Sequence, residues 1–369
     1  MKLPVVNGLR GVAIVGVVLY HLLSQFTEPG TSVLDTLVEN GWMGVNLFFV
    51  LSGFVLALPY FEGRRAMDGE ADAVRFLRRR ARRLFPLLWV NFAVALGLVA
   101  AGIAPLPVDF ASDRFLFDLF FYATATFVFV PDLYYPPPNW VLWSLGLEVW
   151  FSAVFPLLLV LVRRVGIGAV VGGAFGVAFL VRVLGEQHYG GVFNGVEGAQ
   201  LDAIKDSFVG RIDEFVAGIG VAWFHGRGRR AGRAAIPLLV AGAALVGFAM
   251  DRWDAVHLGQ LDRDLVPALY DLTTVGFALV LLGALGLPEA SRRVLANPPL
   301  QLLGMMCYSL YVWHGVLIFV VFADRPFSAG AAAAYGAALL AVSAVTYRWI
   351  EFGHVKETRT LFVPPAAGS

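Results

Sequence analysis

The sequence is poor in cysteine and in charge, and both shortages exclude classes of protein. Its only cysteine is Cys307, so the chain can build neither a disulfide framework nor a metal site of several cysteines, and we expect no metal. Charged residues make up 15% of its 369 residues, below the roughly 25% of ordinary soluble domains. The net charge is only +1, so nothing favours nucleic acid as a partner.

Apolar residues are in excess: they account for 58% of the chain, and the mean hydropathy is +0.72. A helix that crosses a bilayer needs about 20 mostly apolar residues, and ten such windows follow one another along the chain. They are 5–25, 44–61, 84–104, 140–162, 167–184, 208–224, 234–250, 267–287, 302–322 and 329–349. The sequence therefore predicts an all-α, polytopic membrane helix bundle of about ten transmembrane helices.

An eleventh apolar stretch, Phe115 to Val130, is only 16 residues long, and Pro131 follows it. Basic residues prefer cytosolic loops. If the stretch does not cross, 19 Lys and Arg residues lie on the cytosolic side and five lie outside; if it crosses, every later basic loop moves outside. We therefore predict a bacterial inner-membrane protein with both termini in the cytosol. Phe115 to Val130 would then be a short interfacial or re-entrant helix, or a buried helix in an outer cap.

The domain organisation predicted from this pattern is simple. Residues 1–351 form one integral membrane domain, residues 352–369 form a short cytosolic tail, and no soluble domain is fused to them. The first apolar stretch lacks the basic region and cleavage site of a signal peptide. It also carries Arg10 and His21, so we expect it to remain as the first helix.

Ionisable residues inside these windows are the functional candidates, because a charge at the centre of a bilayer costs at least about 2.5–3.5 kcal/mol. Arg10 and His21 are eleven residues apart, which places them on one helix face with about 16 Å of rise between them. The alternative interpretation is an arginine that reaches the interface and a histidine that is bonded within the core.

Two further groups stand out in the first half of the chain. Ser144 and Glu148 are four residues apart and share a helix face; this carboxylate could bond an imidazole and fix its tautomer, or pair with an arginine for packing only. Arg80 and Arg83 would present adjacent guanidinium groups to phosphates, or only anchor the chain at the cytosolic surface.

Other unusual residues have plainer explanations. Gly44 and Gly53 allow close helix packing, while Asn46 places an amide where lipid offers no partner. His314 lies inside a later helix. Arg211 begins another helix together with Asp213 and Glu214, and a mutual ion pair is the expected arrangement there.

Taken in order, these segments resemble the membrane acyltransferase-3 family, the group of O-antigen and peptidoglycan O-acetylases. The resemblance covers most of the chain, and its specificity lies in the order and spacing of the parts. The parts are Leu9-Arg10-Gly11 with His21, Gly44 to Phe54, Arg80 with Arg83 and Pro86, Trp143-Ser144-Leu145 with Glu148, and Tyr308 to His314. Relatives commonly have an acidic residue where this chain has Asn46.

The resemblance implies an enzyme that moves an acyl group from cytosolic acyl-CoA, here expected to be acetyl-CoA, to a hydroxyl of a carbohydrate or glycolipid acceptor. It implies that His21 is the catalytic base and that Arg10, Arg80 and Arg83 help bind the donor. Our candidate catalytic residues are His21, Glu148 and Arg10. Our candidate donor-binding residues are Arg80, Arg83, Ser144 and Asn46.

The expected depth of each candidate residue in the membrane suggests how these residues act together. We expect Arg80 and Arg83 at the cytosolic face, Glu148 toward the outer face, and His21 between them. His21, assisted by Glu148, would deprotonate the acceptor hydroxyl, whose oxygen attacks the thioester directly. A covalent relay fits less well, since Cys307 has no recognisable base beside it.

Two other classes of function are compatible with the sequence. A proton-coupled transporter or flippase would also use intramembrane His and Glu residues, and a structural partner in a glycan export complex would need neither. The acceptor stays open between several glycans and a sugar on a small metabolite. The outer loops, 106–139 and 185–207, are expected to shape its choice. Acidic residues outnumber the single basic Lys205 in the second loop, so a strongly anionic acceptor fits poorly. They are Glu186, Glu197, Asp202 and Asp206.

Overall fold

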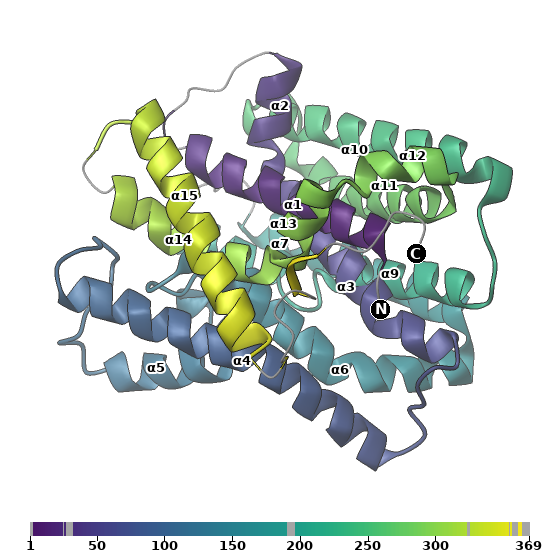
Figure 1. The fold of residues 1–369 in the computed structure, drawn as a ribbon, viewed down its shortest axis with the longest axis horizontal. Coiled ribbons are helices and arrows are strands. Elements are labelled where there is room, and N and C mark those ends of the chain that lie inside the picture. The colour runs from purple at the N-terminus through teal and green to yellow at the C-terminus, as the bar shows by residue number, and fades with distance from the viewer. Residues whose placement is uncertain are drawn as a thin grey trace.

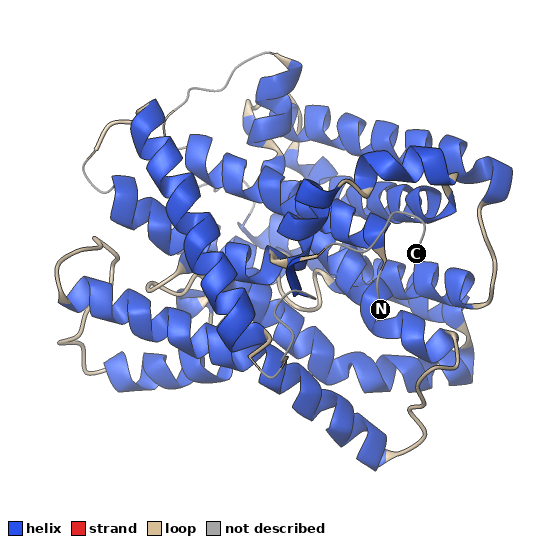
Figure 2. Ribbon diagram, viewed as in Figure 1, coloured by secondary structure: helices blue, strands red, loops and turns tan. Residues whose placement is uncertain are grey.

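The computed structural model describes residues 3–24, 26, 32–189, 196–322, 325–353, 355 and 361–363. In this part of the chain every regular element is a helix (Figure 2). The helices form one bundle, in which α4 and α5 lie on the side opposite α10 and α11 (Figure 1). The predicted all-α, polytopic membrane bundle is confirmed.

Eight helical segments of the described chain are long and apolar enough to cross a membrane, and each overlaps a predicted window. Their main helices are α1 (Pro4–Leu23), α3 (Gly44–Phe61), α4 (Glu70–Ala100), α6 (Trp143–Val165), α7 (Ile167–Tyr189), α10 (Ala235–His257), α11 (Val266–Gly286) and α15 (Ala329–Thr346). The window 302–322 is a broken helix: α13 (Pro298–Met305) and α14 (Cys307–Phe322) meet at an angle of 74°.

The window 208–224 contains a shorter helix than expected, α9 (Ile212–Gly226), of 15 residues. At 1.5 Å per residue it spans about 22 Å, less than the roughly 30 Å of a bilayer core. It lies inside the bundle, where it packs along α3, and its Asp213 and Glu214 have no exposed surface. This helix therefore carries charged groups into the interior.

The stretch from Phe115 to Val130 does not form one helix. The structure contains α5 (Phe115–Thr124), which ends at Ala125 in the left-handed region with φ of 56°. Ten helical residues span about 15 Å, so α5 is too short to cross a bilayer. Leu116 and Phe120 are exposed on its surface.

The remaining helices of the described chain are short. They are α2 (Val33–Glu39), α8 (Val196–Lys205) and α12 (Glu289–Leu295), together with several three-residue 3-10 turns and a π-helical turn at Tyr347–Glu351. Leu361 of the predicted tail is buried, and the Tyr347 hydroxyl donates to its carbonyl oxygen at 3.2 Å. Lys2, Lys356 and Arg359, which entered the charge count, lie outside the described residues.

α3 packs closely against α9 and α1 through glycines. A Cβ atom on Gly53 would stand 1.9 Å from the Phe215 carbonyl oxygen, and one on Gly218 would stand 2.0 Å from that of Val50. The backbones of α3 and α9 are therefore in contact. A Cβ atom on Gly44 would likewise stand 2.5 Å from the carbonyl oxygen of Ala13. The predicted packing role of Gly44 and Gly53 is confirmed.

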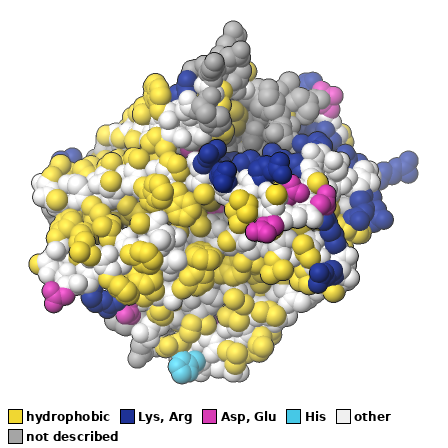
Figure 3. All heavy atoms as spheres, turned by 90° about the horizontal axis from the view of Figure 1, so that it is seen from below, with side chains coloured by type: hydrophobic (Ala, Val, Ile, Leu, Met, Phe, Trp, Pro, Cys, Tyr) yellow, Lys and Arg dark blue, Asp and Glu magenta, His cyan; other side chains and the backbone are white. Residues whose placement is uncertain are grey.

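The surface fits a membrane environment. One face is covered largely by hydrophobic side chains, while Lys and Arg side chains gather in one region of it (Figure 3). Exposed hydrophobic side chains occur on most of the long helices, among them Trp89, Leu157, Leu180 and Val240. Such a surface would be unfavourable in water and is suited to lipid.

Candidate active site

Three neighbouring cavities contain most of the candidate residues. The first, of about 310 Å³, is lined by six arginines and one carboxylate, that of Glu148. We name it the basic cavity, and its arginines are Arg10, Arg64, Arg65, Arg79, Arg80 and Arg83. The second, the throat, of about 60 Å³, shares Arg10, Ser52, Arg83 and Glu148 with it. The third, the aromatic chamber, of about 420 Å³, shares Tyr311 with the throat.

The arginines of the basic cavity come from separate elements. Arg80 and Arg83 lie on α4, and Arg10 joins them from α1. Arg80 is paired: its Nη2 donates to Glu148 Oε1 at 2.6 Å, and its Nε donates to Ser152 Oγ at 3.0 Å. Within the described chain no hydrogen bond or ion pair engages Arg10 or Arg83. Two guanidinium groups thus face a cavity without a hydrogen-bonded carboxylate from the described chain. Glu148 lines the same cavity, and Glu351 attracts Arg83 by charge alone.

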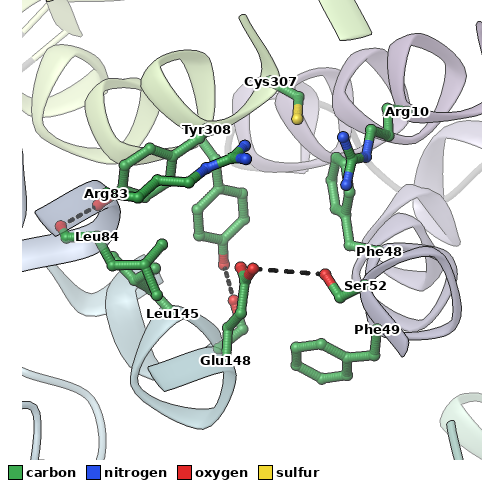
Figure 4. A pocket seen from close by; sticks show the side chains of 12 residues that line it. Arg10, Phe48, Phe49, Ser52, Arg83, Leu84, Leu145, Glu148, Cys307 and Tyr308 are labelled. Atoms are coloured by element: carbon green, nitrogen blue, oxygen red, sulfur yellow. Dashed lines mark hydrogen bonds between the residues drawn. The ribbon is translucent and has the colours of Figure 1, made fainter. Parts of the chain in front are cut away.

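The throat connects these arginines with α14. Figure 4 shows Arg83 and Arg10 extending into it from opposite sides, with Cys307 and Tyr308 of α14 between them and Glu148 opposite. Ser144 also lines the throat, and its hydroxyl donates to the Tyr311 hydroxyl at 2.6 Å. Four of the candidate residues, Arg10, Arg83, Ser144 and Glu148, therefore line one cavity.

The predicted contact between Glu148 and His21 is wrong for the described residues, because Glu148 binds Arg80. The predicted order of depths is also wrong: Glu148 lies between the basic cavity and the throat, whereas His21 lies in the aromatic chamber. The cause is the length of α4. It begins at Glu70, so Arg80 lies about 15 Å along the helix and reaches Glu148 on α6.

His21 instead meets a second histidine. Its Nδ1 lies 2.9 Å from Nε2 of His314, which is fully buried on α14. The Nδ1 of His314 lies 2.6 Å from the Tyr311 carbonyl oxygen. A carbonyl only accepts, so this nitrogen carries the proton and Nε2 of neutral His314 accepts from His21. His21 Nδ1 is then the donor, and the lone pair of its imidazole is on Nε2, which is the arrangement of a base oriented by a neighbour.

Sequence reasoning noted His314 as a second histidine within a helix but gave it no role. The two histidines are 293 residues apart, so no local pattern connects them. The signal was its position inside an apolar helix, where an ionisable group is a functional candidate.

The aromatic chamber is built from rings and charges. Trp140 meets the His21 ring edge-on, with centroids 4.7 Å apart. The other aromatic lining residues are Tyr20, Trp42, Tyr135, Trp143, Trp253, Tyr270 and Tyr311. Asp202, Lys205, Asp206 and Arg211 add charge to the lining, so two residues of α8, Asp202 and Lys205, form part of the wall.

Every cation of this wall is paired. Lys205 Nζ lies 2.7 Å from Asp202 and 3.0 Å from Asp206, and Arg211 lies 2.7 Å from Asp206 and 2.6 Å from Glu214. Burial raises the pKa of Asp206, but Arg211 and Lys205 outweigh it, and this pKa falls to about 2. Burial lowers the pKa of Lys205, but Asp202 and Asp206 outweigh it and hold this pKa well above its usual value. Both groups are therefore charged at neutral pH.

The expected ion pair around Arg211 is confirmed for Glu214 and is wrong for Asp213. Asp213 binds Arg182 of α7, which has no exposed surface and also lies 2.8 Å from Asp271. Because α9 packs inside the bundle, Asp213 and Glu214 face different neighbours. The interior thus contains two groups of buried charges. Arg211 pairs with Asp206 and Glu214, and Arg182 pairs with Asp213 and Asp271.

Asn46 belongs to this network and lies apart from the arginines of the basic cavity. It is 1% exposed, and its Nδ2 donates to Glu214 Oε1 at 2.9 Å. It is not among the residues that line the three cavities. The expectation that Asn46 binds the donor is not supported by this position, because the contact of α3 with α9 directs it to Glu214.

Comparison with known proteins shows the family of the chain. The acyltransferase domain of the acyltransferase-3 family matches residues 3–348. The exopolysaccharide production protein ExoZ of Rhizobium meliloti is 30% identical over 76% of this chain and 78% of its own length. The O-acetyltransferase OatA of Staphylococcus aureus is 28% identical over 42% of this chain, but over only 24% of its own length. No solved structure matches the chain.

A polytopic helix bundle together with these matches defines a membrane acyltransferase. The match over residues 3–348 makes the assignment specific. The chain belongs to the acyltransferase-3 family, as its motifs indicated.

Proposed function

We propose that the protein transfers an acetyl group from cytosolic acetyl-CoA to a hydroxyl of a carbohydrate or glycolipid, in a bacterial inner membrane with both termini in the cytosol. The observation that supports this most is the order of the cavities. An arginine-rich cavity lies on one side of a narrow throat and a histidine pair lies on the other. Family membership favours a transferase over the transporter, flippase and export-partner alternatives.

The basic cavity is the proposed donor site. Phosphates prefer guanidinium groups, which bind them with charge-assisted hydrogen bonds. Arg10 and Arg83 form no hydrogen bond or ion pair within the described chain, so their N–H groups are able to bind the phosphates of CoA. Arg80 is held by Glu148 and would shape the cavity. The pantetheine arm then enters the throat.

His21 is the proposed base. Its Nε2 takes the proton of the acceptor hydroxyl while the acceptor oxygen attacks the thioester carbonyl. A C–O bond forms, the C–S bond breaks, and the CoA sulfur leaves as a thiolate that takes the proton from the His21 imidazolium. The products are the acyl ester and CoA. His314 keeps the His21 ring in the required tautomer.

The aromatic chamber is the proposed acceptor site. Its volume of about 420 Å³ lies within the roughly 300–1000 Å³ typical of ligand pockets. Aromatic rings offer flat apolar faces to the C–H groups of a sugar, and the charges of Asp202 and Lys205 can bond its hydroxyls. The paired charges of the wall suit an uncharged sugar. The names of the relatives, exopolysaccharide production and O-acetyltransferase, support such an acceptor.

Replacing the base tests the proposal. The purified protein in liposomes is supplied with acetyl-CoA and with glycans of the producing cell, and the mass of the glycans is measured. His21→Ala should lower transfer by roughly 10²–10⁴-fold while acetyl-CoA still binds. His188→Ala, at an exposed histidine of α7, is the matched control. Full transfer by His21→Ala refutes the role of His21, and transfer that does not depend on acetyl-CoA refutes the donor.

A further inference from the structure

Tyr311 occupies a position between two of the cavities. Within the described chain it is the one residue that lines both the throat and the aromatic chamber. It lies on α14, is 7% exposed, and belongs to the same helix as His314. Its side chain therefore forms part of the wall between the proposed donor and acceptor sides.

The side chain is held in this position by its neighbours. The Tyr311 hydroxyl donates to the Val141 carbonyl oxygen at 2.6 Å and accepts from Ser144 Oγ at 2.6 Å. Its ring meets the ring of Phe48 edge-on, with centroids 6.4 Å apart. Its carbonyl oxygen accepts from His314 at 2.6 Å. Elements from three parts of the chain thus fix one ring beside the histidine pair.

Such a wall matters because the thioester has two possible acceptors. The throat, of about 60 Å³, has room for only a few water molecules, whereas the chamber of about 420 Å³ has room for many. If the chamber water and Nε2 of His21 reach the thioester together, water attacks the carbonyl. A C–O bond forms, the C–S bond breaks and the proton ends on the CoA sulfur, which yields free acid and CoA.

We propose that the ring of Tyr311 is a partition that keeps the thioester on the throat side until an acceptor is bound, and so directs the acyl group to the acceptor instead of water. This proposal rests on the proposed function, since it requires acetyl-CoA as the donor and His21 as the base. Tyr311 is a positioning residue in this scheme: it excludes water from the reacting atoms and takes no part in the chemistry.

The test measures the release of CoA without any acceptor. Protein in liposomes receives acetyl-CoA alone, and a thiol assay follows the release. The wild-type protein should release CoA slowly. Tyr311→Ala removes the ring and should raise this rate by on the order of tenfold. Tyr311→Phe keeps the ring and should stay close to the wild type. Tyr311→Ala combined with His21→Ala should lose the added release, because the base is gone.

Tyr308 supplies a matched control. It lies three residues earlier on α14, is 8% exposed, and its hydroxyl donates to the Leu84 carbonyl oxygen at 2.5 Å. It lines the throat and not the chamber. Tyr308→Ala therefore enlarges the throat by the same side chain without opening it to the chamber. The release of CoA without acceptor should not rise in this variant.

Each other outcome has a definite meaning. An unchanged release in Tyr311→Ala, with acetyl-CoA still bound, overturns the partition. An equal rise in Tyr308→Ala and Tyr311→Ala also overturns it, because throat volume would then be the cause. If the wild-type protein consumes no acetyl-CoA even with glycan acceptors present, the proposed function fails before Tyr311 is tested.

Discussion

The basic cavity and the aromatic chamber use charged residues in opposite ways. In the basic cavity six arginines face one carboxylate, and two of them, Arg10 and Arg83, form no hydrogen bond or ion pair within the described chain. In the chamber both cations have carboxylate partners, Lys205 in Asp202 and Asp206, and Arg211 in Asp206 and Glu214. The first arrangement leaves positive charge to a ligand, and the second satisfies it within the protein.

The role of an intramembrane charged residue is therefore indicated mainly by whether the protein supplies a partner for it. Burying a charge is costly unless it is paired. A paired cation such as Arg211 therefore supports the fold, and its loss leaves a carboxylate without compensation. A cation beside a cavity that forms no ion pair within the described chain, such as Arg83, still has charge to offer to a ligand. Four substitutions test this contrast.

The largest effect is expected from Arg211→Ala. It leaves Asp206 and Glu214 buried without their main counter-ion, which typically costs about 3–5 kcal/mol. The thermal midpoint of the protein in detergent should fall, by about 2–4 °C for each kcal/mol in a domain of moderate size. Arg83→Ala should leave the midpoint nearly unchanged. If Arg211→Ala has a wild-type midpoint, the chamber network does not support the fold.

The second effect concerns the donor. Arg83→Ala removes a charged hydrogen-bond donor worth about 1.5–3 kcal/mol, so KM for acetyl-CoA should rise roughly 10- to 100-fold, with a smaller change in kcat. Steady-state kinetics with acetyl-CoA measure both. Arg78→Ala is the control, because Arg78 is exposed on the same helix and does not line the basic cavity. An equal rise in KM for both variants would mean that Arg83 only anchors the chain at the membrane surface.

These results also show how far the sequence alone could lead. Apolar windows predict most helices because each helix needs about 20 consecutive apolar residues to cross lipid. Arg10, His21 and Glu148 were detectable as ionisable groups in such windows, and Arg83 as part of the basic segment just before one. All four line the three cavities. What could not be predicted is which groups meet.

Pairing depends on helix ends and on tertiary contacts. Glu148 meets Arg80 because α4 starts earlier than its apolar window. His21 meets His314 because the bundle places α1 beside α14. Asn46 reaches Glu214 because glycines let α3 and α9 touch. None of these causes is visible in residue spacing along one helix.

The third effect separates two roles for Glu148. Glu148→Gln keeps an acceptor for Arg80 but removes the one negative charge that lines the basic cavity. The cavity then attracts an anionic donor more strongly, and KM for acetyl-CoA should fall about threefold, with kcat nearly unchanged. Kinetics at low ionic strength give the clearest measurement. If turnover instead falls by roughly a hundredfold or more, Glu148 assists proton transfer.

The smallest effect is expected when pH is varied, because the charges of Asp206 and Lys205 in the chamber wall should hardly change the stability. The pKa of Asp206 is lowered to about 2 in the folded protein, so its stabilising contribution is complete above the unfolded value near 4 and is lost as pH falls through 2. The pKa of Lys205 is raised, so its contribution is complete below the unfolded value near 10 and is lost only as pH rises through the folded value.

Neither group therefore titrates between pH 5 and 9, and the charges of Asp206 and Lys205 should be constant there. Comparing the wild-type protein with Asp206→Asn isolates this contribution, because all other groups titrate in both proteins. The difference between their thermal midpoints should change by less than about 2 °C across that range, which corresponds to less than about 1 kcal/mol. A difference that shrinks steadily from pH 8 to pH 5 would mean that Asp206 takes up a proton there. Its ion pairs with Arg211 and Lys205 would then be weaker than their distances indicate, and the contrast with the basic cavity would be smaller.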